Sequence, residues 1–164
     1  MQRIIFLYGL SGAGKNFIGE ALARQNNFYF YDGDDLLTPP MKKQLHQNKI
    51  FTQPMRDEFV AQLILKLNNL LKTHTKIIIA QGLYKKSNRQ QLKTAFPEAH
   101  FIEVKANDKN IEQRLRQKNL HHYAQLIKNE FESGDDKVIE NNTTLAAALD
   151  QVSISIEFHT EFLV

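Results

Sequence analysis

The amino-acid sequence predicts an α/β fold in which a parallel β-sheet carries helices on both faces. Two short, almost entirely apolar runs, Arg3–Tyr8 (RIIFLY) and Lys76–Ala80 (KIIIA), have the composition of strands that are buried on both faces. Segments with apolar residues three and four positions apart alternate with such runs, as expected for helices that cover a sheet. A glycine-rich turn joins the first strand directly to the first helix. Because the 164 residues contain no internal repeat and no low-complexity linker, we expect one domain over residues 1–164.

The first half of the chain is predicted to hold three strands and two long helices. These are a strand over Arg3–Tyr8, a helix from about Lys15 to Asn26, a strand over Phe28–Tyr31, an amphipathic helix over Met55–Leu71 and a strand over Lys76–Ala80. In the first helix, Ile18 and Leu22 recur at helical spacing. The periodicity weakens after Leu36, around Thr38-Pro39-Pro40, so we expect short helical turns and a mobile substrate-binding segment over about residues 36–55.

The second half continues the alternation of helix and strand. The predicted elements are a short helix over Asn88–Ala95, a strand over His100–Val104, a helix from a cap at Asp108 to about Asn119, a helical stretch near Tyr123–Phe131, a brief extended segment at Val138-Ile139, a helix from Thr143 or Thr144 to about Leu149, and a strand over Val152–Phe158. Pro97 ends the first of these helices. The alternating pattern of Val152–Phe158 (VSISIEF) predicts a strand that closes the sheet.

The composition argues against several classes of protein. Hydrophobic and charged fractions of 42% and 24% are ordinary for a soluble globular protein. The absence of cysteine excludes disulfides and thiolate metal sites, and it fits a cytoplasmic location. The N-terminus has no signal-peptide pattern and no apolar run approaches the ~20 residues of a membrane span, so we expect no membrane partner. The net charge of +3, spread over scattered cations, argues against a nucleic-acid partner.

The turn after the first strand has the residues of a phosphate-binding loop. Gly9-Leu-Ser-Gly-Ala-Gly-Lys15-Asn16 follows the P-loop pattern, with the preceding strand and following helix that the pattern requires. Glycines let backbone N–H groups converge on phosphate oxygens, the helix N-terminus adds partial positive charge, and Lys15 supplies a mobile cation. The predicted nucleotide-binding residues of the loop are Gly9, Ser11, Gly12, Ala13, Gly14, Lys15 and Asn16. The alternative is a plain strand-to-helix turn.

The residues beside this loop predict a metal site and a base. Asn16 stands where the pattern usually has a hydroxyl that holds Mg²⁺; its amide oxygen is an acceptable hard ligand but sits one bond further out. Asp32-Gly33-Asp34 ends the second predicted strand, at the edge where open α/β sheets bind ligands. We expect Asp32 to share the metal with Asn16, and Asp34 to accept a hydrogen bond from a substrate hydroxyl. The alternative is an acidic β-turn.

Two groups of cations lie where they could reach a phosphate or an acidic substrate. Arg114 and Lys118 are four residues apart and share a helix face. Lys85, Lys86 and Arg89 follow the end of the third predicted strand. Each group can bind an anion or can form a solvated basic surface, and these residues alone leave both alternatives open.

Together the motifs resemble the gluconate kinase family, which belongs to the P-loop small-metabolite kinases and is related to shikimate kinase. The resemblance rests on Gly9–Lys15, Asp32-Gly33-Asp34, Arg56, Leu83–Arg89, Phe101–Lys105, Glu112–Leu115 and His121, in one register from about Ile4 to Phe131. It implies a P-loop NTPase three-layer sandwich, with a five-stranded parallel sheet of order 2-3-1-4-5 and a lid over about residues 116–130. It also implies ATP-dependent phosphorylation of a small anionic polyhydroxy acid, such as gluconate, with Mg²⁺.

The resemblance also implies roles for individual side chains. By matching position, Lys15 and Asp34 are the catalytic pair, Arg114 contacts adenine, and Lys118 takes the place of the lid cation. Arg56, Lys85 and Arg89, with Asp34, face the carboxylate or hydroxyls of the substrate. The departures from the family pattern fall mostly in this substrate pocket, for example at Leu37-Thr38 and Gln81-Gly82.

Other functions remain open at this point. Asn16 and the altered pocket also fit a nucleotide-binding regulatory module with weak or lost kinase activity. A kinase for shikimate-like or nucleotide acceptors is a further alternative, and a sequence pI of about 9.0 is the one feature that favours nucleic-acid binding. Exposed apolar positions on the Met55–Leu71 helix are compatible with a homodimer.

Overall fold

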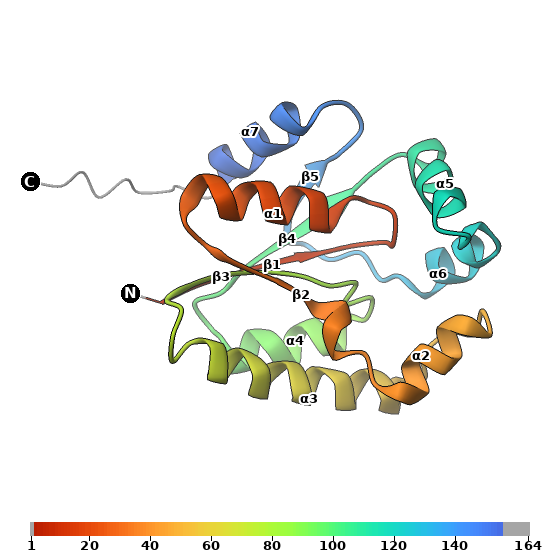
Figure 1. The fold of residues 1–164 in the computed structure, drawn as a ribbon, viewed down its shortest axis with the longest axis horizontal. Helices are drawn as coiled ribbons and strands as arrows, with labels where there is room; N and C mark the ends of the chain where they lie inside the picture. The colour runs from red at the N-terminus through yellow and green to blue at the C-terminus, as the bar shows by residue number, and fades with distance from the viewer. Residues whose placement is uncertain (1, 156–164) are drawn as a thin grey trace, which may run out of the picture.

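Five parallel strands form the centre of the molecule (Figure 1). The computed structural model describes residues 2–155, with side chains as far as Val152. The strands are β1 (Arg3–Tyr8), β2 (Tyr29–Asp32), β3 (Lys76–Ala80), β4 (His100–Lys105) and β5 (Lys137–Glu140). Their order in the sheet is β2-β3-β1-β4-β5. The α/β fold and the strand order implied by the family resemblance are therefore confirmed.

Helices cover both faces of this sheet. They are α1 (Lys15–Asn26), α2 (Pro39–His46), α3 (Gln53–Leu70), α4 (Lys86–Ala95), α5 (Asp108–Gln117), α6 (Ala124–Glu130) and α7 (Leu145–Ser155), with the 3₁₀ turns η1 (Gly33–Leu36) and η2 (His121–Tyr123). α1 and α7 lie on one face, and α3 and α4 lie on the other (Figure 1). Side chains alternate along β1 to match: Ile5 and Leu7 join the core under α1 and α7, and Phe6 and Tyr8 join the core over α3 and α4.

The closing strand predicted at Val152–Phe158 is wrong for the part that the structure describes. Val152 to Ser155 form the end of α7, and residues 156–158 lie outside the described residues. The fifth strand is instead Lys137–Glu140, which pairs in parallel with β4. It contains Val138-Ile139, which the sequence predicted only as a brief extended segment.

The helix caps also refine the predicted boundaries. Asp108 was expected to cap α5, but the cap is Asn107, whose Oδ1 accepts a hydrogen bond from Asn110 N at 2.8 Å. Asp108 lies in the first turn, where its charge suits the helix dipole. Of the two candidates for the last helix, Thr144 is the cap, because its Oγ1 accepts a hydrogen bond from Ala147 N at 3.2 Å.

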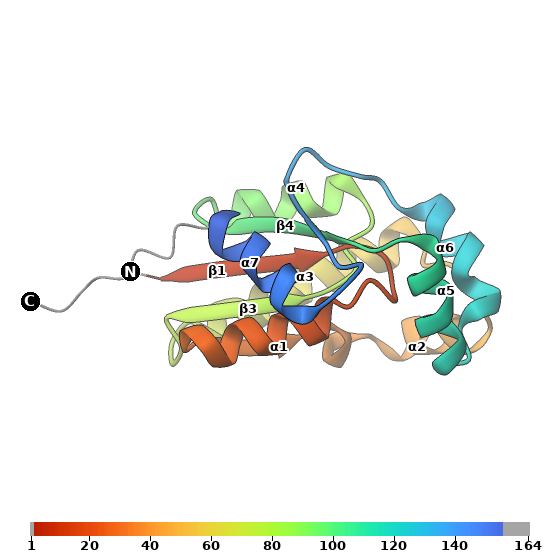
Figure 2. The same ribbon diagram turned by 90° about the horizontal axis from the view of Figure 1, so that it is seen from above.

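The carboxyl ends of the strands point toward α2, α5 and α6, which gather at one end of the molecule (Figures 1 and 2). The predicted short turns after Leu36 correspond to α2 and the loops around it. Within residues 2–155, no helix has both the length and the apolar character needed to cross a membrane. The arrangement places the phosphate loop, the end of β2 and the end of β3 beside one another.

Candidate active site

The loop between β1 and α1 has the backbone of an anion cradle. Gly9, Gly12 and Gly14 have positive φ angles of 142°, 85° and 92°. A Cβ at Gly9 would overlap the Val104 carbonyl oxygen, and a Cβ at Gly14 would overlap Asn141 Nδ2, so the loop requires glycine at both positions. α1 begins directly after Gly14 without a side-chain N-cap, which leaves its first N–H groups available to a ligand. The loop therefore fits nucleotide phosphates.

Lys15 is held against this loop. Its Nζ donates hydrogen bonds to the carbonyl oxygens of Gly9, at 2.9 Å, and Leu10, at 2.8 Å. Burial lowers the pKa of Lys15 to about 8, with Lys118 adding to the fall and Asp34 opposing it. A phosphate dianion beside Nζ would supply the negative charge that favours the ammonium form.

Asp34 lies in η1 and lines the same cavity as Lys15. Desolvation raises the pKa of Asp34 above its ordinary value, the neighbouring Asp32 carboxylate raises it further, and Lys15 and Lys118 oppose the rise. A carboxylate with a raised pKa is a stronger base toward a hydroxyl proton. Lys15 and Asp34 therefore place a cation and a carboxylate of raised pKa in one cavity.

The two predicted metal ligands contact each other. Asn16 Nδ2 donates a hydrogen bond to Asp32 Oδ2 at 2.6 Å, and Asp32 Oδ1 accepts one from Asp34 N at 2.9 Å. Among residues 2–155 there is no cluster of three or more His, Cys, Asp or Glu that could hold a metal ion. Mg²⁺ in phosphoryl-transfer sites commonly takes one or two protein oxygens together with water and phosphate, so the oxygens of Asn16 and Asp32 fit it.

A cavity of about 170 Å³ opens beside the phosphate loop. Its apolar wall comes largely from the segment around α2 and from α3, through Leu37, Met41, Leu45, Phe51, Phe59 and Val60. Its polar and aromatic wall comes from Ser11, Lys15, Asp34, Arg56, Gln81, Tyr84, Asn88 and Tyr123. Lys15 and Asp34 thus lie in the wall of a pocket of the size of a small metabolite.

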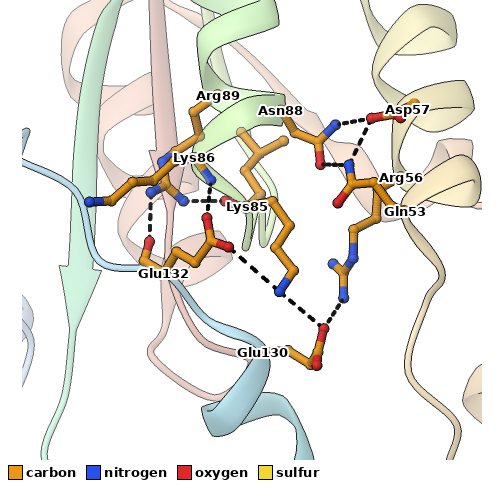
Figure 3. Close-up of polar contacts among 10 residues, drawn as sticks. Gln53, Arg56, Asp57, Lys85, Lys86, Asn88, Arg89, Glu130 and Glu132 are labelled. Atoms are coloured by element: carbon orange, nitrogen blue, oxygen red, sulfur yellow. Dashed lines mark hydrogen bonds and ion pairs between the residues drawn. The ribbon is translucent and has the colours of Figure 1, made fainter.

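The three predicted substrate cations are placed differently. Arg56 lines the cavity, and its guanidinium lies over the rings of Phe51 and Tyr84, at 5.7 and 5.6 Å from their centroids. Lys85 does not line the cavity, because Glu130 and Glu132 pair with its Nζ at 3.2 and 3.7 Å (Figure 3).

Arg89 is placed in the core. It is buried, and it stacks on the Tyr8 ring with its Cζ 4.5 Å from the centroid. Its two terminal nitrogens donate to the carbonyl oxygens of Leu83 and Glu132, each at 2.6 Å. The side chain does not line the cavity, and its hydrogen bonds fix the 83–89 segment to the chain that follows α6 (Figure 3).

Arg114 and Lys118 lie near the phosphate loop. Arg114 Nη1 donates to the Gly12 carbonyl at 3.0 Å, and its Nη2 is 3.5 Å from the Asn141 carbonyl. Lys118 is exposed at the end of α5, and its charge lowers the pKa of both Lys15 and Asp34. Of the two predicted cations, Arg114 contacts the loop, and Lys118 contributes to its positive potential.

Three side chains at this site were not selected as site residues from the sequence. Gln81 is 8% exposed, lines the cavity, and has a buried Oε1 without a hydrogen-bond partner. The hydroxyl of Tyr84 accepts a hydrogen bond from Ser11 N at 3.1 Å, and burial raises the pKa of this hydroxyl to about 12. Asn141 Nδ2 donates to the Ala13 carbonyl at 2.8 Å. All three follow strands, so their position at the carboxyl edge of the sheet was the feature of the sequence from which they could have been selected.

The fold, the phosphate loop and the adjoining cavity define a small-molecule kinase of the P-loop class. A family model described as AAA domain matches residues 4–138, most of the chain, and the chain belongs to this family. It is 26% identical over 155 residues to the thermoresistant gluconokinase of Escherichia coli (strain K12), covering 92% of this chain and 86% of that protein. It is 29% identical over 133 residues to the thermosensitive gluconokinase of the same organism, covering 77% and 68%.

A solved structure has the same fold. The crystal structure of a gluconokinase from Sinorhizobium meliloti 1021 superimposes with a TM-score of 0.80 at 19% identity. The match covers 92% of this chain and 89% of that chain. The family model and the two gluconokinase relatives, together with this common fold, confirm the resemblance to the gluconate kinase family.

Proposed function

We propose that this protein transfers the terminal phosphate of ATP to a hydroxyl group of a small polyhydroxylated carbohydrate. The observation that carries the proposal is that Lys15 and Asp34 line one cavity, directly beside a glycine-rich phosphate loop. A phosphate cation and a base that share one cavity can serve the two halves of a phosphoryl transfer. Because the two curated relatives are gluconokinases, gluconate is the first acceptor to test.

The proposed phosphoryl transfer needs a base, a cation beside the phosphate and a metal ion. Asp34 orients the acceptor hydroxyl and takes its proton as the hydroxyl oxygen bonds to the γ-phosphorus, while the bond from that phosphorus to the β–γ bridging oxygen breaks and ADP leaves. Lys15 stabilises the charge on the transferring phosphoryl group. Mg²⁺, held by Asn16 and Asp32, would neutralise phosphate charge.

The pocket supplies candidate contacts to the acceptor. The unpartnered Oε1 of Gln81 is available to a substrate hydroxyl, and the unpartnered Nε of Arg56, a residue that lines the cavity, is a candidate donor to an acceptor oxygen. We propose that residues 36–55, which contribute Leu37, Met41 and Phe51 to the wall, are the substrate-binding segment. We further propose that residues 116–130 act as a lid, with Arg114 against adenine and Lys118 near the phosphates.

The test is substrate-dependent ADP release with ATP and Mg²⁺ over a panel of gluconate, other sugar acids, neutral sugars, shikimate and nucleoside monophosphates. We expect turnover with a carbohydrate and a loss of about 10²–10⁴-fold in kcat for Asp34→Asn, because a general base is removed. Asp35→Asn, one residue further on, is the matched control and should retain the rate. No acceptor-dependent ADP release across the panel would contradict the proposal.

A nucleotide-binding module without turnover is the second candidate, and Asn16 at the metal position favours it. Calorimetry separates the two functions. ADP binding that is lost in Lys15→Ala, together with no turnover of any acceptor, would support the module. Measurable phosphorylation of a carbohydrate would exclude it.

A further inference from the structure

One carboxylate, that of Glu130, lies between Arg56 and Lys85, two of the three cations expected to face an acidic acceptor (Figure 3). Its Oε2 is 3.5 Å from Arg56 Nη2 and 3.2 Å from Lys85 Nζ. The three side chains are 24%, 11% and 21% exposed, so water screens this triad less than a surface ion pair. Glu130 therefore neutralises positive charge that would otherwise face an acceptor.

The chain around Glu130 is anchored independently of the ion pairs. Glu132 N donates to the Tyr84 carbonyl at 2.9 Å, and Glu132 Oε2 accepts a hydrogen bond from Lys86 N at 2.8 Å. The ring of Phe131 packs edge-on against Tyr84, with centroids 5.6 Å apart. These contacts hold the C-terminal end of α6 beside Lys85, and they keep the Glu130 carboxylate within reach of both cations.

Arg56 connects this triad to the cavity. Arg56 lines the cavity, one of its terminal nitrogens pairs with Glu130, and its Nε is buried without a hydrogen-bond partner. Lys85 is directed to Glu130 and Glu132, and it does not line the cavity. An anionic group that approaches Arg56 therefore meets a guanidinium whose charge is already offset by a carboxylate.

We propose that Glu130 is a specificity-determining residue that lowers the affinity of the acceptor cavity for anions, and so extends the acceptor class from sugar acids to their neutral polyhydroxylated analogues. This inference rests on the proposed kinase function, since it concerns the acceptor site of that reaction. The physical reason is that the field of a carboxylate beside two cations repels a second carboxylate at the same place. Glu130 acts on the acceptor through Arg56, so we regard it as a residue of selectivity and not of catalysis.

The test compares gluconate with gluconamide, its neutral amide, in the wild-type protein and in Glu130→Gln. We expect kcat/KM for gluconate to rise about tenfold relative to gluconamide in the variant, through KM, because the isosteric amide removes one negative charge beside Arg56. Glu112→Gln removes the same charge from an exposed position on α5, and the ratio should stay at the wild-type value. An unchanged ratio in Glu130→Gln, or an equal change in Glu112→Gln, would overturn the inference.

A binding measurement separates this inference from the proposed function. If neither protein releases ADP with either compound, calorimetric binding of gluconate is compared between wild type and Glu130→Gln. Tighter binding of gluconate by the variant would support the role of Glu130 while the proposed acceptor fails. Equal affinity would overturn the role of Glu130. The thermal midpoint of each variant confirms that the folded protein is being compared.

Discussion

Lys15 and Asp34 carry the proposed chemistry, and desolvation disfavours the charged form of both side chains. Desolvation lowers the pKa of Lys15 to about 8 and raises that of Asp34. The two groups partly offset this effect, because the negative charge of Asp34 raises the pKa of Lys15 and the positive charge of Lys15 lowers the pKa of Asp34. The negative charge of a phosphate beside Lys15 would favour its ammonium form.

A pH profile of the reaction should report these two groups. The pKa of Lys15 is lowered, so in the free protein the ammonium is present below about pH 8 and is lost as the pH rises through that value. We expect kcat/KM for ATP to fall above pH 8, and to fall at acidic pH as Asp34 is protonated. The alkaline fall should be absent in Lys15→Arg, because a guanidinium keeps its proton. An unchanged alkaline fall in that variant would assign it to another group.

Asn16 is the second residue with a distinct expectation. Its amide nitrogen donates a hydrogen bond to Asp32, the other proposed metal ligand, so part of the hydrogen-bonding capacity of the Asn16 side chain is already used. We predict that Asn16→Ser lowers the Mg²⁺ concentration for half-maximal rate by about tenfold, since a hydroxyl there reaches the ion directly. The measurement is the rate as a function of Mg²⁺ at saturating ATP. Unchanged or lower activity would mean that Asn16 is adapted to its place.

At the residue scale, the sequence predicts sites that a short local pattern specifies, and it does not predict ion pairs between residues far apart in the chain. Gly9, Gly14 and Lys15 were predicted as a phosphate cradle because a single short pattern specifies the backbone. The pairing of Lys85 with Glu130 joins residues far apart in the chain, and no local pattern encodes such a contact. Sequence reasoning therefore placed Lys85 at the substrate without its counter-ion.

At the scale of elements, α7 explains the one strand that was predicted wrongly. Ala148, Leu149 and Val152 are buried against α1 at helical spacing, so Val152 belongs to the apolar face of a helix. The alternation that begins at Val152 is short, and over so few residues a period of two and a helical period select overlapping positions. The place at the sheet edge is taken by β5, whose two central apolar residues gave only a weak signal.

The chain that follows β5 has a role at the phosphate loop. Asn141 is 6% exposed, and its amide holds the Ala13 carbonyl. We predict that Asn141→Ala raises KM for ATP about tenfold with little change in KM for the acceptor. The reason is that the Ala13 carbonyl loses its hydrogen-bond donor and the backbone of the phosphate loop is held less firmly. Thr143→Ala, an exposed neighbour, is the control. Equal changes in both KM values would contradict a role confined to the phosphate loop.

At the scale of the whole molecule, α3 has one side packed in the core and another exposed to solvent. Leu63 is fully buried in the core, and Leu65 is 63% exposed. We predict that Leu63→Ala lowers the free energy of unfolding by about 2–5 kcal/mol, as expected for a cavity in a packed core. Leu65→Ala should change it by less than about 0.5 kcal/mol. Urea unfolding measures both, and a similar loss in the two variants would contradict the packing described for α3.

β1 and β3 were predictable because each is a compact apolar run, whereas β5 has only two apolar residues between polar ones. The family resemblance supplied the order of the strands. The homodimer stays a prediction. Leu65 is the one large apolar side chain of α3 that is clearly exposed. That single residue gives no extended apolar face on the described helix.

The parallel sheet also bears on how the protein folds. The contacts that complete the phosphate loop come from the far part of the chain: Arg114 reaches Gly12 across 102 residues, and Asn141 reaches Ala13 across 128. Such contacts close large loops, so the entropic cost of closing the loop must be met before the contact contributes any stability. The phosphate loop precedes these supporting residues in the chain, so a chain synthesised only as far as α4 has the phosphate-loop sequence without Arg114 and Asn141.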